Sequence, residues 1–263
     1  MYEFNYQKAS SADAAAQALG SAEDGKVMAG GMTLIPTLKQ RLASPSDVID
    51  LAGAGMVGIS RSGDTLVIGA MTTHGAVAGS SEVQSAIPAL AYLAGTIGDP
   101  AVRARGTIGG SIANNDPAAD YPSAVVALNA TVKTTKREIA ADDFFTGMFD
   151  TALEEDEIIT EVHFPIPKKA GYAKFKNPAS RYPMAGSFVA ETADGIRVAI
   201  IGAGPGVFRV KDYEDALSSN FSKDAIKDGV VSADGLNSDI HGSADYRAHL
   251  CTVMTRRAID AVG

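Results

Sequence analysis

The sequence is poor in cysteine, with only Cys251 among its 263 residues. A single thiol cannot form an internal disulfide, and it cannot hold an iron–sulfur cluster, which usually requires four thiolates. Cys251 lies within a helical pattern between Leu250 and Val253, so we interpret it as a small core residue. Any iron–sulfur cluster that works with this chain must therefore lie on another polypeptide.

Basic residues and long apolar runs are also scarce. The chain has 23 Lys and Arg against 31 Asp and Glu, a formal net charge of −8, which matches a nucleic-acid backbone poorly. No apolar run approaches the roughly 20 residues of a membrane helix. The first residues, MYEFNY, lack the basic and apolar regions of a signal peptide. We therefore expect a cytoplasmic protein with no membrane insertion and no nucleic-acid partner.

The common catalytic motifs are absent as well. There is no G-x-x-x-x-G-K-[ST] phosphate loop, no G-x-S-x-G elbow and no H-E-x-x-H pair. His74, His163, His241 and His249 have no Cys, Asp or Glu partners at the spacing of metal ligands. The acidic run 154–157 is typical of a solvated turn. We expect no catalytic residue and no metal site on this chain.

Alternating helical and strand patterns are present instead, and they indicate an α+β fold. The expected helices are 11–19, 34–42, 72–81, 87–94, 121–128, 142–146, 213–217 and 244–262, and the expected strands are 26–28, 47–51, 57–60, 65–70, 130–134, 158–164, 171–176, 186–192 and 195–202. A loop is expected from Gly95 to Gly110. Pro165-Ile166-Pro167 marks the clearest boundary. It predicts a first domain over 1–165, with subdomains of about 1–53 and 54–165, and a C-terminal domain over 168–263.

Two glycine segments are the candidate ligand site. Ala29-Gly30-Gly31-Met32-Thr33-Leu34 joins an expected strand to an expected helix, where glycines allow a close backbone approach and free N–H groups can hold a pyrophosphate. A second Gly-Gly pair lies in 106–111, and 114–120 follows with amides and carboxylates that can contact a ribose and a polar ring edge. Two such segments in one α/β region favour a nucleotide cofactor.

A third glycine-rich segment, 202–206, is similar to a dinucleotide-binding fingerprint. Its third glycine is replaced by Val207, and the residues that follow are β-branched and aromatic rather than helical. We predict a strand that ends in a glycine turn, without a cofactor.

The two glycine segments, in this order and spacing, resemble the FAD-binding medium subunit of the xanthine dehydrogenase and aerobic carbon monoxide dehydrogenase family. The likeness extends over AGGMTLIPTLKQRLASPSDVIDL, VIGAMTTH, GDPAVRARGTIGGSIANNDPAADYPSAVVAL and GSADYRAHLCTVMTRRAI, and so covers nearly the whole chain. The resemblance implies a two-subdomain FAD-binding domain of the vanillyl-alcohol oxidase (PCMH) type. It also implies a C-terminal domain made of a small antiparallel sheet with helices.

The resemblance also implies the cofactor-binding residues. Segment 29–33 would wrap the pyrophosphate, Asp120 and Lys176 would lie near the flavin nucleotide, and Ile97 and Tyr182 would lie against the ring. The full implied set is Ala29, Gly30, Gly31, Met32, Thr33, Leu34, Ile97, Thr107, Gly109, Gly110, Ser111, Asn114, Asp116, Asp120, Ile159, Lys176 and Tyr182. Many family members have Asn at the position of Ser111. Because no His or Cys suggests covalent attachment, we expect noncovalent FAD.

In this family a large subunit holds the molybdenum cofactor and oxidises the substrate, and a small subunit carries [2Fe–2S] clusters. The chain would then be an oxidoreductase subunit that passes electrons through FAD to an external acceptor, within a dimer of heterotrimers. Two alternatives are a stand-alone flavin oxidoreductase of the vanillyl-alcohol oxidase type and a nucleotide-binding assembly protein that has lost the flavin. The roughly one hundred residues after Pro165 are few for a separate substrate domain.

Overall fold

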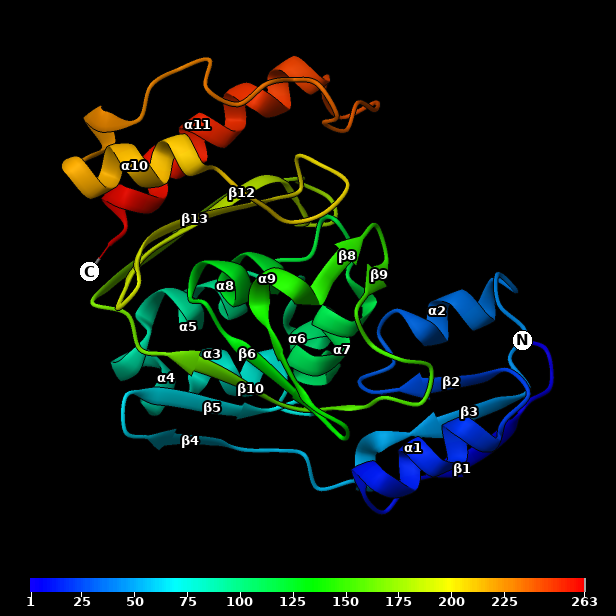
Figure 1. Cartoon of the computed structure of the whole chain (residues 1–263). Helices are drawn as coiled ribbons and strands as arrows, with labels where there is room; N and C mark the ends of the chain where they lie inside the picture. Colours follow the sequence, from blue (N-terminus) through cyan, green and yellow to red (C-terminus); the bar gives the residue numbers. More distant parts are fainter. Residues whose placement is uncertain (263) are drawn as a thin grey trace.

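The computed structural model describes residues 1–262 and arranges them around three main sheets (Figure 1). The N-terminal sheet lies at the lower right of Figure 1, the central sheet with its helices fills the middle, and the C-terminal sheet forms an upper layer. Helices and strands are both abundant along the chain, so the expected mixed architecture is confirmed.

The N-terminal part is a three-stranded parallel sheet in the order β1-β3-β2. Its elements are β1 (Asn5–Lys8), α1 (Ala12–Ser21), β2 (Gly25–Met28), α2 (Leu34–Lys39), β3 (Asp47–Asp50) and a short 3-10 turn (Leu51–Gly53). The Ser11 hydroxyl accepts a 3.0 Å hydrogen bond from the Ala14 N–H and caps α1, as the sequence predicts. The Gly30–Thr33 loop therefore enters α2 from the end of a strand.

The central part is a five-stranded antiparallel sheet in the order β4-β5-β10-β6-β7. The strands are β4 (Ile59–Ser62), β5 (Thr65–Gly69), β6 (Thr131–Thr134), β7 (Glu138–Ala140) and β10 (Ile159–Pro165). Ser62 pairs with Thr65, which confirms the hairpin predicted at Ser62-Gly63-Asp64. Leu66, Ile68 and Val162 are fully buried under the neighbouring helices.

Seven short helices lie between this sheet and the C-terminal layer (Figure 1). They are α3 (His74–Gly79), α4 (Ser81–Ala86), α5 (Pro88–Gly95), α6 (Pro100–Arg105), α7 (Ile108–Asn114), α8 (Tyr121–Ala127) and α9 (Ala141–Phe144), and a hairpin of β8 (Phe145–Gly147) and β9 (Asp150–Thr151) follows α9. Every residue of α8 is buried, because this helix lies between the central part and the C-terminal sheet. The buried helix predicted over 121–128 is confirmed.

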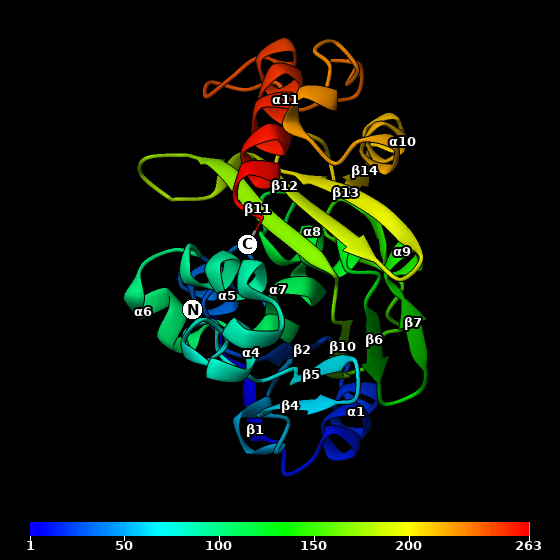
Figure 2. The same cartoon turned by 90° about the vertical axis from the view of Figure 1, so that its left-hand side faces the viewer.

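The C-terminal part is an antiparallel sheet in the order β11-β12-β13-β14, covered on its outer face by two helices (Figure 2). Its elements are β11 (Lys169–Lys176), β12 (Pro183–Thr192), β13 (Gly195–Ile201), β14 (Phe208–Arg209), α10 (Lys211–Ser219), a 3-10 turn (Lys223–Ala225) and α11 (Ala244–Asp260). Alternate residues face opposite layers: Phe188 belongs to the central core, and Val189 packs under the outer helices. Cys251 is fully buried in the outer layer, as predicted.

Three local predictions are wrong. The segment from Gly95 to Gly110 is not one loop, because the Asp99 side chain caps α6 and the Thr107 side chain caps α7. The helix expected over 142–146 ends at Phe144, where the β8–β9 hairpin begins. The acidic run 154–157 is not wholly solvated, since Glu157 is buried and paired with Arg137.

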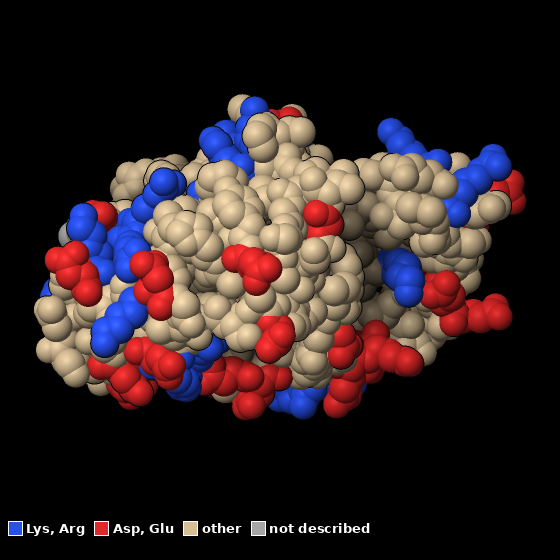
Figure 3. Space-filling model, turned by 90° about the horizontal axis from the view of Figure 1, so that it is seen from above, with Lys and Arg blue, Asp and Glu red and all other residues tan. Residues whose placement is uncertain are grey.

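The outer face of the C-terminal layer carries acidic and basic side chains side by side (Figure 3). This face shows no continuous basic surface that would suit a phosphate backbone. Among the residues that the structure describes, none of the helices has the length and apolar character that a membrane crossing requires.

Candidate functional site

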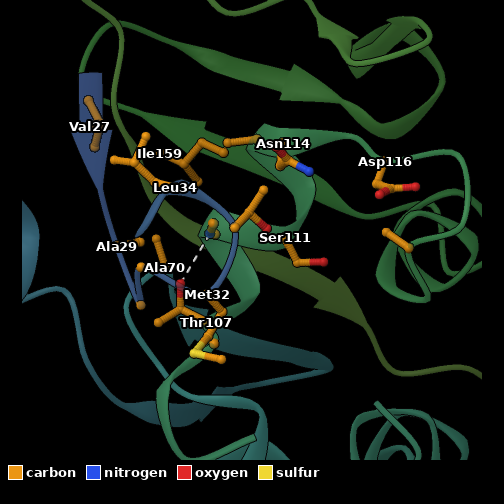
Figure 4. Close-up of a pocket in the computed structure, with 18 of the residues that line it drawn as sticks. Val27, Ala29, Met32, Leu34, Ala70, Thr107, Ser111, Asn114, Asp116 and Ile159 are labelled. Carbon is orange, nitrogen blue, oxygen red and sulfur yellow. Dashed lines mark hydrogen bonds between the residues drawn. The ribbon is translucent and has the colours of Figure 1, made fainter. Parts of the chain in front are cut away.

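A cavity of about 680 Å³ lies where the N-terminal, central and C-terminal parts meet. Residues from all three parts line it, and Figure 4 shows ten of them labelled, from Val27 on β2 to Ile159 on β10. The cavity is lined by Ala29, Gly30, Gly31, Met32, Thr33, Leu34, Ile97, Thr107, Gly109, Gly110, Ser111, Asn114, Asp116, Asp120, Ile159 and Tyr182. The structure thus brings together every predicted cofactor-binding residue except Lys176.

The two glycine segments touch one another at the cavity wall. A Cβ atom added to Gly30 would lie 2.0 Å from the carbonyl oxygen of Arg105, and one added to Gly110 would lie 3.2 Å from the Ala29 Cβ. Gly31 has a φ of +74°, in the left-handed region that residues with side chains rarely adopt. Glycine is therefore required here by loop packing and by backbone conformation.

The first glycine segment has free N–H groups. Within residues 1–262, the N–H groups of Gly30, Gly31, Met32 and Thr33 donate no backbone hydrogen bond, although the carbonyls of Gly31 and Thr33 accept bonds from the N–H groups of Ile35 and Thr37. Consecutive free amides that line a cavity are suited to binding an anion such as a pyrophosphate.

The second glycine segment differs, because its N–H groups are engaged. Ile108 donates to the Thr72 carbonyl, Gly109 to the Ala70 carbonyl and Gly110 to the Thr107 hydroxyl oxygen, the last at 3.2 Å (Figure 4). This segment therefore forms a rigid wall, and its contribution to a ligand must come from side chains such as Ser111.

A buried carboxylate, that of Asp120, also lines the cavity. The Asp120 side chain is 4% exposed, and its Oδ1 accepts hydrogen bonds from the Tyr172 hydroxyl at 2.5 Å and the Lys174 ammonium at 2.7 Å. Burial raises the pKa of Asp120 above its usual value, while Lys174 and Tyr172 oppose that shift. Tyr182 lines the same cavity, and partial burial together with the nearby Asp116 raises the pKa of its hydroxyl.

Lys176 lies outside the cavity lining and is exposed at the end of β11. On a regular strand Tyr172, Lys174 and Lys176 would share one face. The pairing with β12 shifts register between Phe175 and Lys176, where Met184 of β12 has no partner, and Lys176 is the last residue of β11, at the exposed end of the strand. Lys174, which the sequence did not single out, occupies the buried position instead.

His74 is the main lining residue that sequence reasoning missed. It is 5% exposed, and burial together with the nearby Arg103 lowers its pKa to about 4, so the imidazole is neutral at pH 7. A Cβ on Gly106 would lie 2.6 Å from the His74 Nε2, so the second glycine segment leaves room for this ring. His74 is the first residue of α3, which Thr73 caps. This position at a strand-to-helix turn was the available signal in the sequence.

Other missed residues also line the cavity. Leu19, Lys26, Val27 and Leu51 line it from the N-terminal part, Glu154, Glu155, Glu157 and Ile158 line it from the segment before β10, and Ser180 and Arg181 come from the β11–β12 connection. These contacts depend on long-range packing and leave no local sequence signal.

Metal and cluster chemistry has no site in the described part of the chain. No group of three or more His, Cys, Asp or Glu residues there could hold a metal ion. Burial raises the pKa of the Cys251 thiol to about 12, so it stays protonated at neutral pH. The third glycine-rich segment connects two strands, as predicted, because β13 ends at Ile201 and the short strand β14 follows in place of a helix.

Comparison with known proteins gives matches over nearly the full length. Residues 2–167 match a family model described as "FAD binding domain in molybdopterin dehydrogenase". The nicotine 6-hydroxylase medium subunit of Paenarthrobacter nicotinovorans is 37% identical, covering 98% of this chain and 96% of the relative. The carbon monoxide dehydrogenase medium chain of Afipia carboxidovorans is 35% identical over the same shares. A structure of carbon monoxide dehydrogenase from Hydrogenophaga pseudoflava superposes with a TM-score of 0.91 at 35% identity, covering 98% of this chain and 96% of that chain.

Proposed function

This chain belongs to the family of FAD-binding domains of molybdopterin dehydrogenases, and from that premise we propose that residues 29–33 hold the pyrophosphate of FAD in the cavity described above. The observation that carries this proposal is the row of free N–H groups on Gly30, Gly31, Met32 and Thr33. A pyrophosphate would give these amides the acceptors that the protein does not provide.

The lining of the cavity suits the two ends of FAD. The side chains of Leu19, Val27 and Leu51 offer apolar contacts to an adenine ring, and Asp120 and Tyr182 offer polar contacts to an isoalloxazine ring, with Ile97 beside it. Thr107, Gly109, Gly110, Ser111, Asn114, Asp116 and Ile159 complete the proposed contact set. The single cysteine, Cys251, lies in another layer, and FAD is proposed to be bound noncovalently.

We assign residues 1–165 to an FAD-binding domain of the vanillyl-alcohol oxidase type, with subdomains of about 1–53 and 54–165. The parallel N-terminal sheet and the antiparallel central sheet support these subdomains, with the cavity between them. Residues 168–263 form the C-terminal domain of the flavoprotein subunit, supported by the separate sheet that begins at Lys169.

The chain functions as the FAD-binding electron-transfer subunit of a molybdenum hydroxylase complex. FAD can accept electrons singly and deliver one or two, which suits a position between [2Fe–2S] clusters and an external acceptor. This chain's residues bind and orient the cofactor and exclude water from it. The clusters and the molybdenum cofactor belong to partner subunits, in keeping with the absence of cluster-forming cysteines from this sequence.

The relatives named as medium subunits or chains match from end to end, which implies a small iron–sulfur partner and a large molybdenum partner. A dimer of heterotrimers is our proposal for the complete assembly. A stand-alone flavin oxidoreductase fits less well, because the C-terminal sheet is covered by α5 and α8 on one face and by α10 and α11 on the other. That layer is thus packed on both faces and offers no obvious substrate domain.

The test is purification of the complex from its native host, followed by an absorption spectrum and identification of the copurifying chains. We expect flavin and iron–sulfur absorption together with two partner subunits. Flavin on an active lone chain would support the stand-alone enzyme instead. A colourless intact complex would contradict the proposed cofactor.

A further inference from the structure

The two oxygens of the Asp120 carboxylate have different surroundings. Both hydrogen bonds from Tyr172 and Lys174 go to Oδ1. Within residues 1–262, only three side-chain atoms are enclosed without a hydrogen-bond partner, on His74, Tyr121 and Arg247. The Asp120 Oδ2 is not one of them and receives no protein hydrogen bond, so it is open to the cavity that Asp120 lines.

Lys174 is enclosed by protein and does not line the cavity. Its side chain is 4% exposed, and its ammonium donates to the Asp120 Oδ1 at 2.7 Å and to the Thr96 carbonyl at 3.1 Å. Among the ion pairs of the described residues, this is the only one in which both side chains are less than 5% exposed. The pair is therefore shielded from solvent, unlike the exposed ion pairs elsewhere on the chain.

This ion pair joins three segments of the cavity wall. Asp120 precedes α8, Lys174 lies on β11, and Thr96 is adjacent to Ile97, which lines the cavity. The Tyr172 hydroxyl adds a second contact from β11 to the same carboxylate oxygen. One side of the carboxylate is thus fixed by protein, and the other side is left for a ligand.

We propose that Lys174 is a positioning residue that acts through Asp120: with Tyr172, it fixes the carboxylate so that Oδ2 faces the cofactor, and it compensates the negative charge of that carboxylate at the cavity wall. This inference rests on the proposed function, because FAD is the ligand that Oδ2 would contact. Removal of one member of a buried ion pair leaves the other charge without compensation in a poorly solvated site. The identity of residue 174 therefore determines both the affinity for FAD and the reduction potential of bound FAD.

The test is a double-mutant cycle in the intact complex, with Lys174→Met, Asp120→Asn and the combination of both substitutions. The readouts are the dissociation constant of FAD, obtained by rebinding after its removal, and the midpoint potential of bound FAD from a spectroelectrochemical titration. We expect Lys174→Met to weaken FAD binding by about tenfold or more when Asp120 is present. When residue 120 is Asn, Lys174 is itself the uncompensated buried charge, so the same substitution should not weaken FAD binding further and should restore part of what Asp120→Asn loses.

Equal effects of Lys174→Met in both backgrounds would overturn the proposal, and so would the absence of any effect of the single variant. Lys174→Arg, which keeps the charge, should lose less affinity than Lys174→Met. If Lys174→Met does not fold, Lys174→Arg and the double variant still give the comparison, because neither contains an unpaired buried charge.

Lys169→Met removes an exposed lysine from the same strand and is the matched control. A wild-type complex that binds no FAD would instead contradict the proposed function.

Discussion

The Gly30 backbone lies against the Arg105 carbonyl so closely that a Cβ atom at residue 30 would be 2.0 Å from that oxygen. The nearest obstacle is backbone, which cannot move aside as a flexible side chain can. The contact joins the free amides of the first glycine segment to the end of α6 and the start of the second segment.

Gly30→Ala is therefore expected to push these two segments apart. We expect FAD affinity to fall by about tenfold or more, with a loss of stability of about 1–3 kcal/mol from overpacking. Equilibrium dialysis of FAD and thermal unfolding of the full chain measure the two effects. Gly79→Ala is the matched control, because a Cβ at Gly79 meets nothing within 4 Å. Unchanged FAD binding in Gly30→Ala would mean that this contact does not shape the cofactor site.

Asn115 is expected to stabilise the β8–β9 hairpin beside the cavity helix α7. It adopts a left-handed conformation with a φ of +41°, and its side-chain amide donates to the carbonyls of Gly147 at 2.8 Å and Asp150 at 2.7 Å. Asn115→Asp keeps the local backbone preference but places a carboxylate against two carbonyl oxygens. We expect a loss of about 1–3 kcal/mol, seen as a fall in Tm of roughly 2–4 °C per kcal/mol.

Asn129→Asp is the control for this substitution. Asn129 is also left-handed, with a φ of +53°, but its side-chain amide bonds the exposed Asp194 carboxylate at 3.1 Å. Asn129→Asp loses this bond and places two carboxylates side by side, but solvent screens these exposed charges, so the loss should stay below about 1 kcal/mol. A similar fall in Tm for both variants would show that the buried hydrogen bonds of Asn115 are not the cause.

The sequence predicted the glycine segments because their requirements are local. A strand, two glycines and a helix in succession indicate a close backbone approach wherever the rest of the fold lies. Asp99-Pro100 is also a local helix-start signal, but a single loop was expected over 95–110 and α6 was missed. The choice between Lys174 and Lys176 was not local, because it depends on which residue of β11 lies against Asp120 in the folded chain. For the same reason, sequence alone did not place His74 in the cavity wall.

His74 is expected to make stability depend on pH between about 6.5 and 4. Its folded-state pKa is lowered from 6.5 to about 4 by burial and by Arg103, so the unfolded chain binds the proton more readily in this window. Stability contributed by the neutral ring is therefore present above pH 6.5 and decreases as the pH falls toward 4. In urea denaturation of the full chain, His74→Phe should lose much of the pH slope in this window. A slope equal to that of the wild type would contradict the assigned role.

Glu157 is expected to make stability depend on pH in a lower range than His74 does. Burial alone would raise its pKa, but hydrogen bonds from Arg137, Thr134 and the Glu154 N–H lower it from 4.5 to about 2. Because the folded-state pKa is depressed, the contribution of Glu157 is complete above about pH 4.5 and is lost as the pH falls toward 2. The shift corresponds to a contribution of up to about 3 kcal/mol.

Glu157→Gln keeps the shape of the side chain but removes its titration. We expect this variant to be less stable than the wild type at pH 7, with the difference narrowing as urea denaturation is repeated between pH 4.5 and 3. The exposed Glu138 lies on β7 beside the same strand β6 and provides a control, because Glu138→Gln should leave the pH profile unchanged. A constant difference between Glu157→Gln and the wild type across this window would show that Glu157 contributes through packing alone. The two pH windows also separate the carboxylate from the imidazole, since the His74 contribution begins to fall about two pH units higher.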